Sequence, residues 1–109
     1  MLLAAPVAYP DAFQYGGMPY QTLNVSAANG VLANDTDSDG DSMSAHLVNS
    51  PSTGVISLNS DGSFEFTSYM GGADSFTYRV YDGQTYSAPT TATIGTAGGG
   101  RGRLVLFRV

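Results

Sequence analysis

Short segments in which every second residue is apolar are the feature that most limits what this chain can fold into. In SFEF the apolar residues are Phe64 and Phe66, and in SFTYRVYD they are Phe76, Tyr78 and Val80. A period of two places these side chains on one face of a β-strand, whereas a helix needs apolar residues three and four positions apart. No stretch keeps the helical period, and Gly or Pro interrupts most stretches that could. The chain is therefore predicted to be all-β.

Turn sequences divide the chain into seven expected strands. Asp61-Gly62 predicts a hairpin, and Gly71-Gly72 and Asp82-Gly83 separate further pairs of strands. A chain of 109 residues is close to the commonest size of one domain. Seven short strands with closely spaced turns are typical of an antiparallel β-sandwich with two sheets. The predicted strands cover residues 6–15, 20–26, 42–49, 54–58, 63–68, 74–81 and 86–94.

The distribution of charge excludes several classes of partner. The first 95 residues hold all nine acidic residues but only Arg79 of the four basic ones, which leaves this part with a net charge of −8. Such an acidic body repels nucleic acid and anionic membranes and attracts divalent cations. No apolar run approaches the length that inserts across a membrane. The absence of cysteine excludes disulfides, thiolate catalysis and cysteine-based zinc sites.

Four segments taken together resemble one protein family. They are APVAYPDAF, LNVSAANGVLANDTDSDGDSMSAHLV, GVISLNSDGSFEFT and GGADSFTYRVYDG, in this order between about Ala4 and Ile94. They are similar to the bacterial cadherin-like or Ig-like tandem repeats of large surface and secreted proteins, including RTX-type adhesins and the related VCBS-repeat proteins. The resemblance implies a Greek-key β-sandwich over residues 4–95, a spacer or adhesive role without catalysis, and stiffening by calcium.

The resemblance also implies a location and a set of partners. Repeats of this kind lie outside the cell or on its surface, next to further repeats of a longer parent chain. The opening MLLAAPVA is too short for a signal peptide and has no basic residue. An export signal is therefore expected elsewhere on the parent chain.

The last residues depart from the family pattern. After Gly95 the sequence continues as TAGGG and RGRLVLFRV, with arginines at positions 101, 103 and 108. Residues 96–109 are expected either to be loosely ordered or to add one strand. If a strand at 104–108 pairs with the same strand of a second copy, the chain forms a homodimer.

The segment NDTDSDGD, from Asn34 to Asp41, carries an aspartate at every second position. Calcium takes about six to eight oxygen ligands, and short loops with alternating carboxylates supply them. The segment matches the first half of an EF-hand loop, but His46 stands at the twelfth position, where an EF-hand needs Glu, so an EF-hand is excluded. A calcium site in a sandwich loop remains. The expected direct ligands are Asp37, Asp39 and Asp41, with Asp35 or Asp82 completing the site.

The expected topology gathers further acidic residues around this loop. In a seven-stranded antiparallel sandwich, the connections between strands two and three, four and five, and six and seven lie at one end. Asp74 is expected at the other end, and Glu65 within a strand. Carboxylates about 4 Å apart repel by about 1 kcal/mol even in water, and a divalent ion removes that repulsion. The residues expected at the shared end, called the acidic pole below, are Asp11, Asp35, Asp37, Asp39, Asp41, Asp61 and Asp82.

A purely structural interpretation of the same segment stays open. Asp-Ser-Asp-Gly is also favourable turn chemistry, because Asp and Ser side chains accept hydrogen bonds from nearby main-chain N–H groups. Gly40 suits a left-handed backbone, and Asp35 then caps the loop. The sequence thus predicts either a calcium loop or an acidic turn.

Aromatic residues provide the alternative function. Tyr81 and Tyr86 flank the turn DGQT and are expected to be exposed, where they could contact a glycan or a surface protein. Tyr78 is expected in the core with its hydroxyl bonded to the backbone. His46 is the only histidine, and it is expected to face solvent on the side of its strand opposite Ala45 and Leu47.

Overall fold

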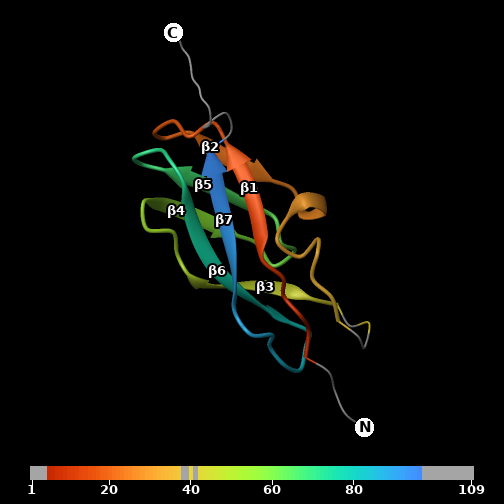
Figure 1. Cartoon of the computed structure of the whole chain (residues 1–109). Coiled ribbons are helices and arrows are strands. Elements are labelled where there is room, and N and C mark those ends of the chain that lie inside the picture. Colours follow the sequence, from red (N-terminus) through yellow and green to blue (C-terminus); the bar gives the residue numbers. More distant parts are fainter. Residues whose placement is uncertain (1–4, 38–39, 41, 97–109) are drawn as a thin grey trace.

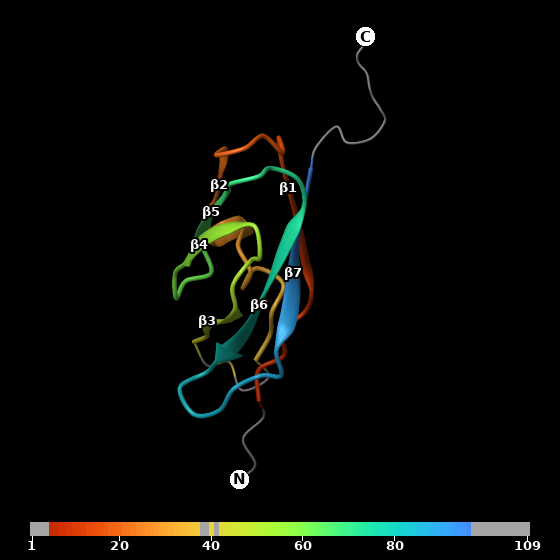
Figure 2. The same cartoon turned by 90° about the vertical axis from the view of Figure 1, so that its left-hand side faces the viewer.

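The alternating apolar residues build two β-sheets that pack face to face (Figure 1). The computed structural model describes residues 5–37, 40 and 42–96. One sheet has the strand order β1-β7-β6-β3 and the other has the order β2-β5-β4. Figure 2 shows the two layers from the side. The strands are β1 (Asp11–Tyr15), β2 (Thr22–Val25), β3 (Ser44–Asn49), β4 (Gly54–Leu58), β5 (Phe64–Ser68), β6 (Asp74–Tyr81) and β7 (Thr90–Thr96), and a short 3-10 helix η1 (Ala27–Asn29) follows β2.

All seven predicted strands are present, and β4 and β6 have the predicted bounds. The first and last predicted strands are too long. β1 begins at Asp11, and upstream of it Val7 pairs with Thr36 of the β2–β3 loop. β7 begins at Thr90, and Tyr86 forms only an isolated bridge with Tyr81. Prolines at positions 6, 10 and 89 explain both differences, because proline has no N–H to donate to a strand partner.

The prediction of a purely antiparallel sandwich is wrong for one pair of strands. β1 and β7 run parallel, with Asp11 opposite Ala92 and Tyr15 opposite Thr96. The other strand pairs are antiparallel. A parallel pair needs a long connection, and here nearly the whole domain lies between the two strands. The Greek-key description of the connections stays a prediction.

Aromatic rings join the two sheets in the core. Phe64 of β5 lies in edge-to-face contact with Phe13 of β1 and Phe76 of β6, at centroid distances of 4.9 and 5.4 Å. Tyr15 and Phe66 form a similar contact between the sheets at 5.7 Å. The five residues that the sequence placed inward on these strands are all buried: Phe64, Phe66, Phe76, Tyr78 and Val80.

The edge strand β3 keeps the predicted pattern only in its first half. Ala45 is buried and His46 is exposed, as predicted. Leu47, which was expected to be buried beside Ala45, is 39% exposed. The register against β6 shifts between Leu47 and Asn49. A bulge of this kind interrupts the alternation after Leu47, and Leu47 itself is exposed at the edge of the sheet, where no further strand of the described chain covers β3.

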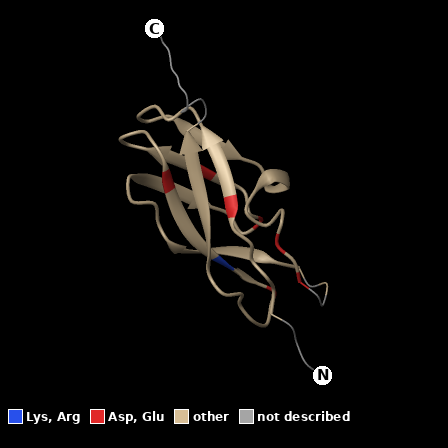
Figure 3. Ribbon diagram, in the orientation of Figure 1, with Lys and Arg blue, Asp and Glu red and all other residues tan. Residues whose placement is uncertain are grey.

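The strand register shows which connections share an end of the sandwich. Val25 and Leu58 both lie opposite Phe64, and Ser44 lies opposite Tyr81. The β2–β3, β4–β5 and β6–β7 connections are therefore at one end, as expected. Figure 3 shows several acidic positions on the loops at this end. The described chain enters at this end and leaves β7 at the opposite end (Figure 1).

Candidate metal site at the acidic pole

Four of the described carboxyl groups of the acidic pole form two pairs, each joining separate parts of the chain. Asp11 at the start of β1 lies with Asp35 of the β2–β3 loop, because both contact the hydroxyl of Tyr78. Asp37 of the same loop lies with Asp82, which follows β6. Among the residues that the structure describes, no three acidic or histidine side chains gather in one metal-binding group. Two expected ligands, Asp39 and Asp41, lie outside the described residues.

The first pair surrounds one buried hydroxyl. Tyr78 Oη lies 2.6 Å from Asp11 Oδ2 and 3.0 Å from Asp35 Oδ2. It also lies 2.9 Å from the carbonyl oxygen of Val31 and 3.2 Å from that of Tyr9. All four neighbours accept hydrogen bonds, and a hydroxyl has only one proton to donate. A second proton, or a cation, is needed to hold these oxygens together without repulsion.

The pKa values of both carboxyl groups in this pair are raised. Burial raises the pKa of Asp11 to about 6; the hydrogen bond from Tyr78 opposes the shift, and the charge of Asp35 adds to it. Burial also raises the pKa of Asp35, although its Oδ1 accepts a hydrogen bond from the Tyr9 N–H at 2.8 Å. Burial and both carboxyl groups raise the pKa of Tyr78, so its hydroxyl keeps its proton. The pair therefore takes up a proton in mildly acidic solution.

The second pair joins the β2–β3 loop to the β6–β7 turn. Asp82 is buried, and its Oδ1 accepts hydrogen bonds from the main-chain N–H groups of Thr85 at 2.8 Å and Gln84 at 2.9 Å. These two bonds lower the pKa of Asp82, and a hydrogen bond from the side chain of Asp37 lowers it further. Two carboxyl groups can bond in this way only when one carries a proton. The structure thus places two carboxyl groups from separate connections where a cation could bridge them.

The β2–β3 loop also has the features of the structural alternative. The N–H of Gly40 donates to the carbonyl oxygen of Asp37 at 3.0 Å, and Gly40 has a φ of 76°. This is a tight turn in which glycine takes the left-handed conformation, as the sequence predicted. Asp35 caps the main-chain N–H of Tyr9 instead of one within its own loop. The β2–β3 loop therefore contains the tight turn of the structural interpretation and also contributes to both carboxyl pairs.

Two further acidic residues accept hydrogen bonds that hold loops in place. Asp61 is at the same end, but its Oδ1 accepts from the side-chain hydroxyl and the main-chain N–H of Ser63, and these bonds lower its pKa. Asp74 is at the opposite end, as expected. Burial acts to raise the pKa of Asp74, but bonds from Thr53, Ser75 and Ser52 outweigh it and lower the pKa.

The central role of Tyr78 was only partly predicted. Its hydroxyl lies within hydrogen-bond distance of two main-chain carbonyl oxygens, in agreement with the expected backbone contact. Its contacts with Asp11 and Asp35 were missed, because these residues are 67 and 43 positions away in the sequence. The available signal was the tyrosine on an inward strand position, since a buried hydroxyl requires a partner.

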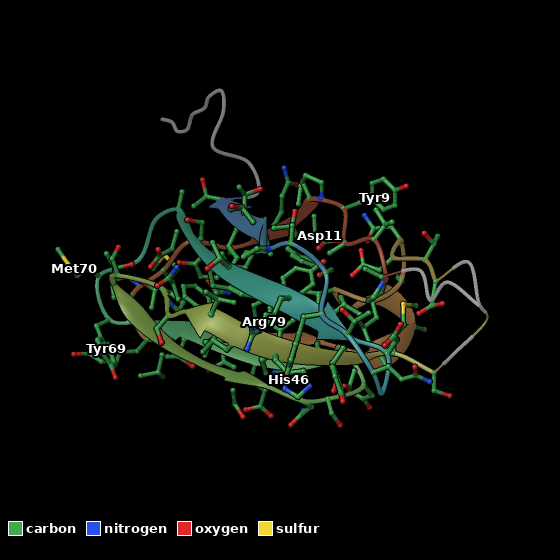
Figure 4. All side chains as sticks on the ribbon, turned by 90° about the horizontal axis from the view of Figure 1, so that it is seen from below. Tyr9, Asp11, His46, Tyr69, Met70 and Arg79 are labelled. Carbon is green, nitrogen blue, oxygen red and sulfur yellow. The ribbon has the colours of Figure 1, made fainter. Side chains whose placement is uncertain are left out.

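Tyr81 and Tyr86 form a second cluster with Arg79 and His46 on the outer face of β3 and β6. Their ring centroids are 4.6 Å apart, and Tyr86 is 40% exposed while Tyr81 is half-buried. The guanidinium carbon of Arg79 lies 3.8 Å from the centroid of the Tyr86 ring. His46 lies 5.9 Å from the same ring. Figure 4 shows His46 and Arg79 next to each other on this face.

Comparison with known proteins establishes the family. The family model for the bacterial cadherin-like domain matches residues 4–98. The chain is a bacterial cadherin-like domain. No curated protein matches this cadherin-like domain. Among its described residues, no helix has the length and apolar character needed to cross a membrane.

Solved structures that resemble the cadherin-like domain include parts of two endo-fucoidan hydrolases from glycoside hydrolase family 107. One is a variant of MfFcnA4, with a TM-score of 0.50, 20% identity and coverage of 86% of the domain. The other is MfFcnA9, with a TM-score of 0.50, 20% identity and coverage of 84%. The domain spans only 14% and 15% of those chains. At this identity the likeness shows the fold alone.

Proposed function

We propose that this cadherin-like domain is a non-enzymatic structural and adhesive module of a bacterial surface or secreted multi-repeat protein, and that it binds calcium at the acidic pole. Membership of the bacterial cadherin-like family supports the structural and extracellular role. The hydrogen bond between the Asp37 and Asp82 side chains carries the proposal of calcium binding. It brings two carboxyl groups from different connections into direct contact.

The donor chemistry of the pole fits calcium. All the described side chains of the two pairs offer oxygen, which calcium prefers as a ligand. Asp37 and Asp82 would hold the ion together with Asp39 and Asp41, whose positions lie outside the described residues, while Asp35 stays in contact with Tyr78 and the Tyr9 N–H. Bound calcium supplies a double positive charge in place of the proton. The loop and the β6–β7 turn would then be fixed together, which stiffens the end where the chain enters and where a preceding repeat would attach.

The non-enzymatic role is supported by the setting of the only histidine. Ser44 Oγ lies 2.9 Å from His46 Nε2, which is a spacing that nucleophilic catalysis could use. His46 is exposed on the outer face of an edge strand, where water competes for the same groups. A serine nucleophile also needs a site that excludes water and stabilises an oxyanion. The face of β3 is open, and a structural role therefore fits it better.

Calcium is expected to stabilise the domain against unfolding. At free calcium about a hundred times its dissociation constant, the gain is about 2.7 kcal/mol. Asp37→Asn and Asp82→Asn should each remove most of this gain, because each deletes one carboxylate of the pair. The measurement is thermal unfolding by circular dichroism with calcium and with a chelator, for the wild type and both variants.

Glu65→Gln is the matched control for calcium binding. It removes one negative charge from an exposed position within β5, away from the two pairs. Its calcium response should equal that of the wild type. A wild-type melting temperature unchanged by millimolar calcium, with no heat in a calorimetric titration, would refute calcium binding. It would leave the structural role to be tested separately.

A second candidate function is binding of an anionic glycan on the outer face of β3 and β6. The observation in its favour is Arg79, which is exposed against the ring of Tyr86 beside His46 on a domain that is otherwise acidic. A guanidinium and aromatic rings on an open face suit a sugar with sulfate or carboxylate groups. Solved structures that share this fold include parts of two endo-fucoidan hydrolases, so fucoidan is the first glycan to test.

Glycan binding is expected to depend on Arg79. Affinity electrophoresis through gels that contain fucoidan should retard the wild type, and Arg79→Gln should weaken binding about tenfold, equal to about 1.4 kcal/mol. Val55→Gln on the exposed edge strand β4 is the control and should bind like the wild type. Equal migration of wild type and Arg79→Gln at every fucoidan concentration would rule out this face.

A further inference from the structure

At the end opposite the acidic pole, four large apolar side chains are exposed on two neighbouring loops. Met18 and Tyr20 of the β1–β2 loop are 63% and 72% exposed, and Tyr69 and Met70 of the β5–β6 loop are 49% and 75% exposed. The Tyr20 and Tyr69 rings lie 6.0 Å apart. Figure 4 shows Tyr69 and Met70 at the tip of the molecule. Single exposed apolar residues are common, but a cluster marks a contact surface. These four residues are called the tyrosine–methionine patch.

The two loops that carry the patch are fixed to each other. The N–H of Tyr20 donates to the carbonyl oxygen of Ser68 at 2.6 Å, and that of Gly72 donates to the carbonyl oxygen of Gly17 at 3.0 Å. A Cβ at Gly71, which has a φ of 76°, would collide with the Gly17 carbonyl oxygen. Tyr20 itself has a φ of 60°, which is unfavourable for tyrosine. A strained backbone held in this way is typical of a binding surface.

The end of β7 lies beside this patch. A Cβ added at Gly17 would lie 2.7 Å from Thr96 Cγ2, so the last residue of β7 touches the β1–β2 loop. The described chain therefore ends at Thr96 beside the patch. Four of the six residues at 97–102 are glycine, a composition that allows the chain to reverse direction within a few residues. Leu104-Val105-Leu106-Phe107 follows, between Arg103 and Arg108.

We propose that Leu104–Phe107 docks on the tyrosine–methionine patch of its own chain. The patch offers exposed apolar surface, and Leu104–Phe107 is a run of four large apolar residues that follows β7 closely. The short connection from Thr96 gives the segment a high local concentration at the patch. Charge adds a smaller contribution, because Asp74 begins β6 at the same end of the sandwich as the patch and Arg101, Arg103 and Arg108 give the tail +3.

Oxidation of methionine in the full chain tests the docking. Peroxide oxidises exposed methionine faster than covered methionine, and peptide mass spectrometry reports each site separately. In the wild type, Met18 and Met70 should oxidise several-fold more slowly than in Leu104→Ser/Phe107→Ser. Met43 is half-buried before β3 at the acidic pole and should oxidise at the same rate in both proteins.

A change in the patch itself should have the same effect. Tyr20→Asn removes the ring and keeps a residue that tolerates a positive φ, so Met70 should oxidise faster. Val55→Asn, on the exposed edge strand β4, is the matched control and should leave both rates unchanged. Equal rates for Met18 and Met70 in the wild type and the tail variant would overturn the proposal. Protection that increases with protein concentration, together with a dimer in size-exclusion chromatography, would also overturn it, because the occupant would then be a second copy.

Discussion

Phe64→Ala is expected to lower the free energy of unfolding by about 3–5 kcal/mol, the usual cost of removing a buried phenylalanine. Phe64 is 1% exposed, and its ring contacts Phe13 and Phe76 on the opposite sheet. Truncation leaves a cavity at the junction of the two sheets, and the rings around it lose their edge-to-face partner. Urea denaturation followed by circular dichroism measures the loss.

Val55→Ala is the matched control for this core prediction. Val55 lies on β4 and is 50% exposed, so its truncation should cost less than about 1 kcal/mol. Equal costs for Phe64→Ala and Val55→Ala would show that the ring contacts between the sheets contribute little to stability.

Asp11→Asn is expected to stabilise the domain at neutral pH and to change its pH dependence. The pKa of Asp11 is raised from 3.8 to about 6, so the folded state binds the proton more tightly than the unfolded state. The stability that this proton contributes is complete below about pH 4 and is lost as the pH rises through about 6. Two pKa units correspond to about 3 kcal/mol, which solvent screening of this half-exposed group reduces to about 1–2 kcal/mol. Asparagine removes the charge and keeps an oxygen to accept from Tyr78.

The measurement is the difference in unfolding free energy between Asp11→Asn and the wild type from pH 4 to pH 7.5. That difference should increase with pH. Asp61→Asn is the matched control, because hydrogen bonds from Ser63 lower the pKa of Asp61 and give the opposite sign. The ionised form of Asp61 stabilises the fold, and that contribution is lost as the pH falls. A difference for Asp11→Asn that is independent of pH would contradict the proton shared around Tyr78.

The sequence predicted the faces of the strands better than their partners. Alternation located β6 over Asp74–Tyr81 and placed Phe76, Tyr78 and Val80 inward, because a period of two has one geometric meaning. It did not predict the parallel pairing of β1 with β7. That pairing depends on how the first and last strands meet, and no local pattern records it. Leu47 was placed wrongly because β3 is an edge strand, and a period of two does not distinguish an edge strand from a central one.

At the acidic pole, the sequence predicted which connections lie together but not which side chains contact each other. Turn sequences and strand order predicted which connections share an end, and the register confirms it. The partner of each carboxyl could not be predicted. Asp35 and Asp37 are two residues apart, yet Asp35 contacts Tyr78 and Asp37 contacts Asp82. Burial and long-range contacts decide these roles, and both arise only after folding.

The parallel pairing of β1 and β7 has a mechanical consequence for a domain with other repeats on both sides. The chain enters below β1 and leaves above β7, so tension applied through the two ends pulls the paired strands in opposite directions along their length. Their hydrogen bonds are then loaded in shear and must break together, whereas a hairpin pulled open from one end loses its bonds one after another.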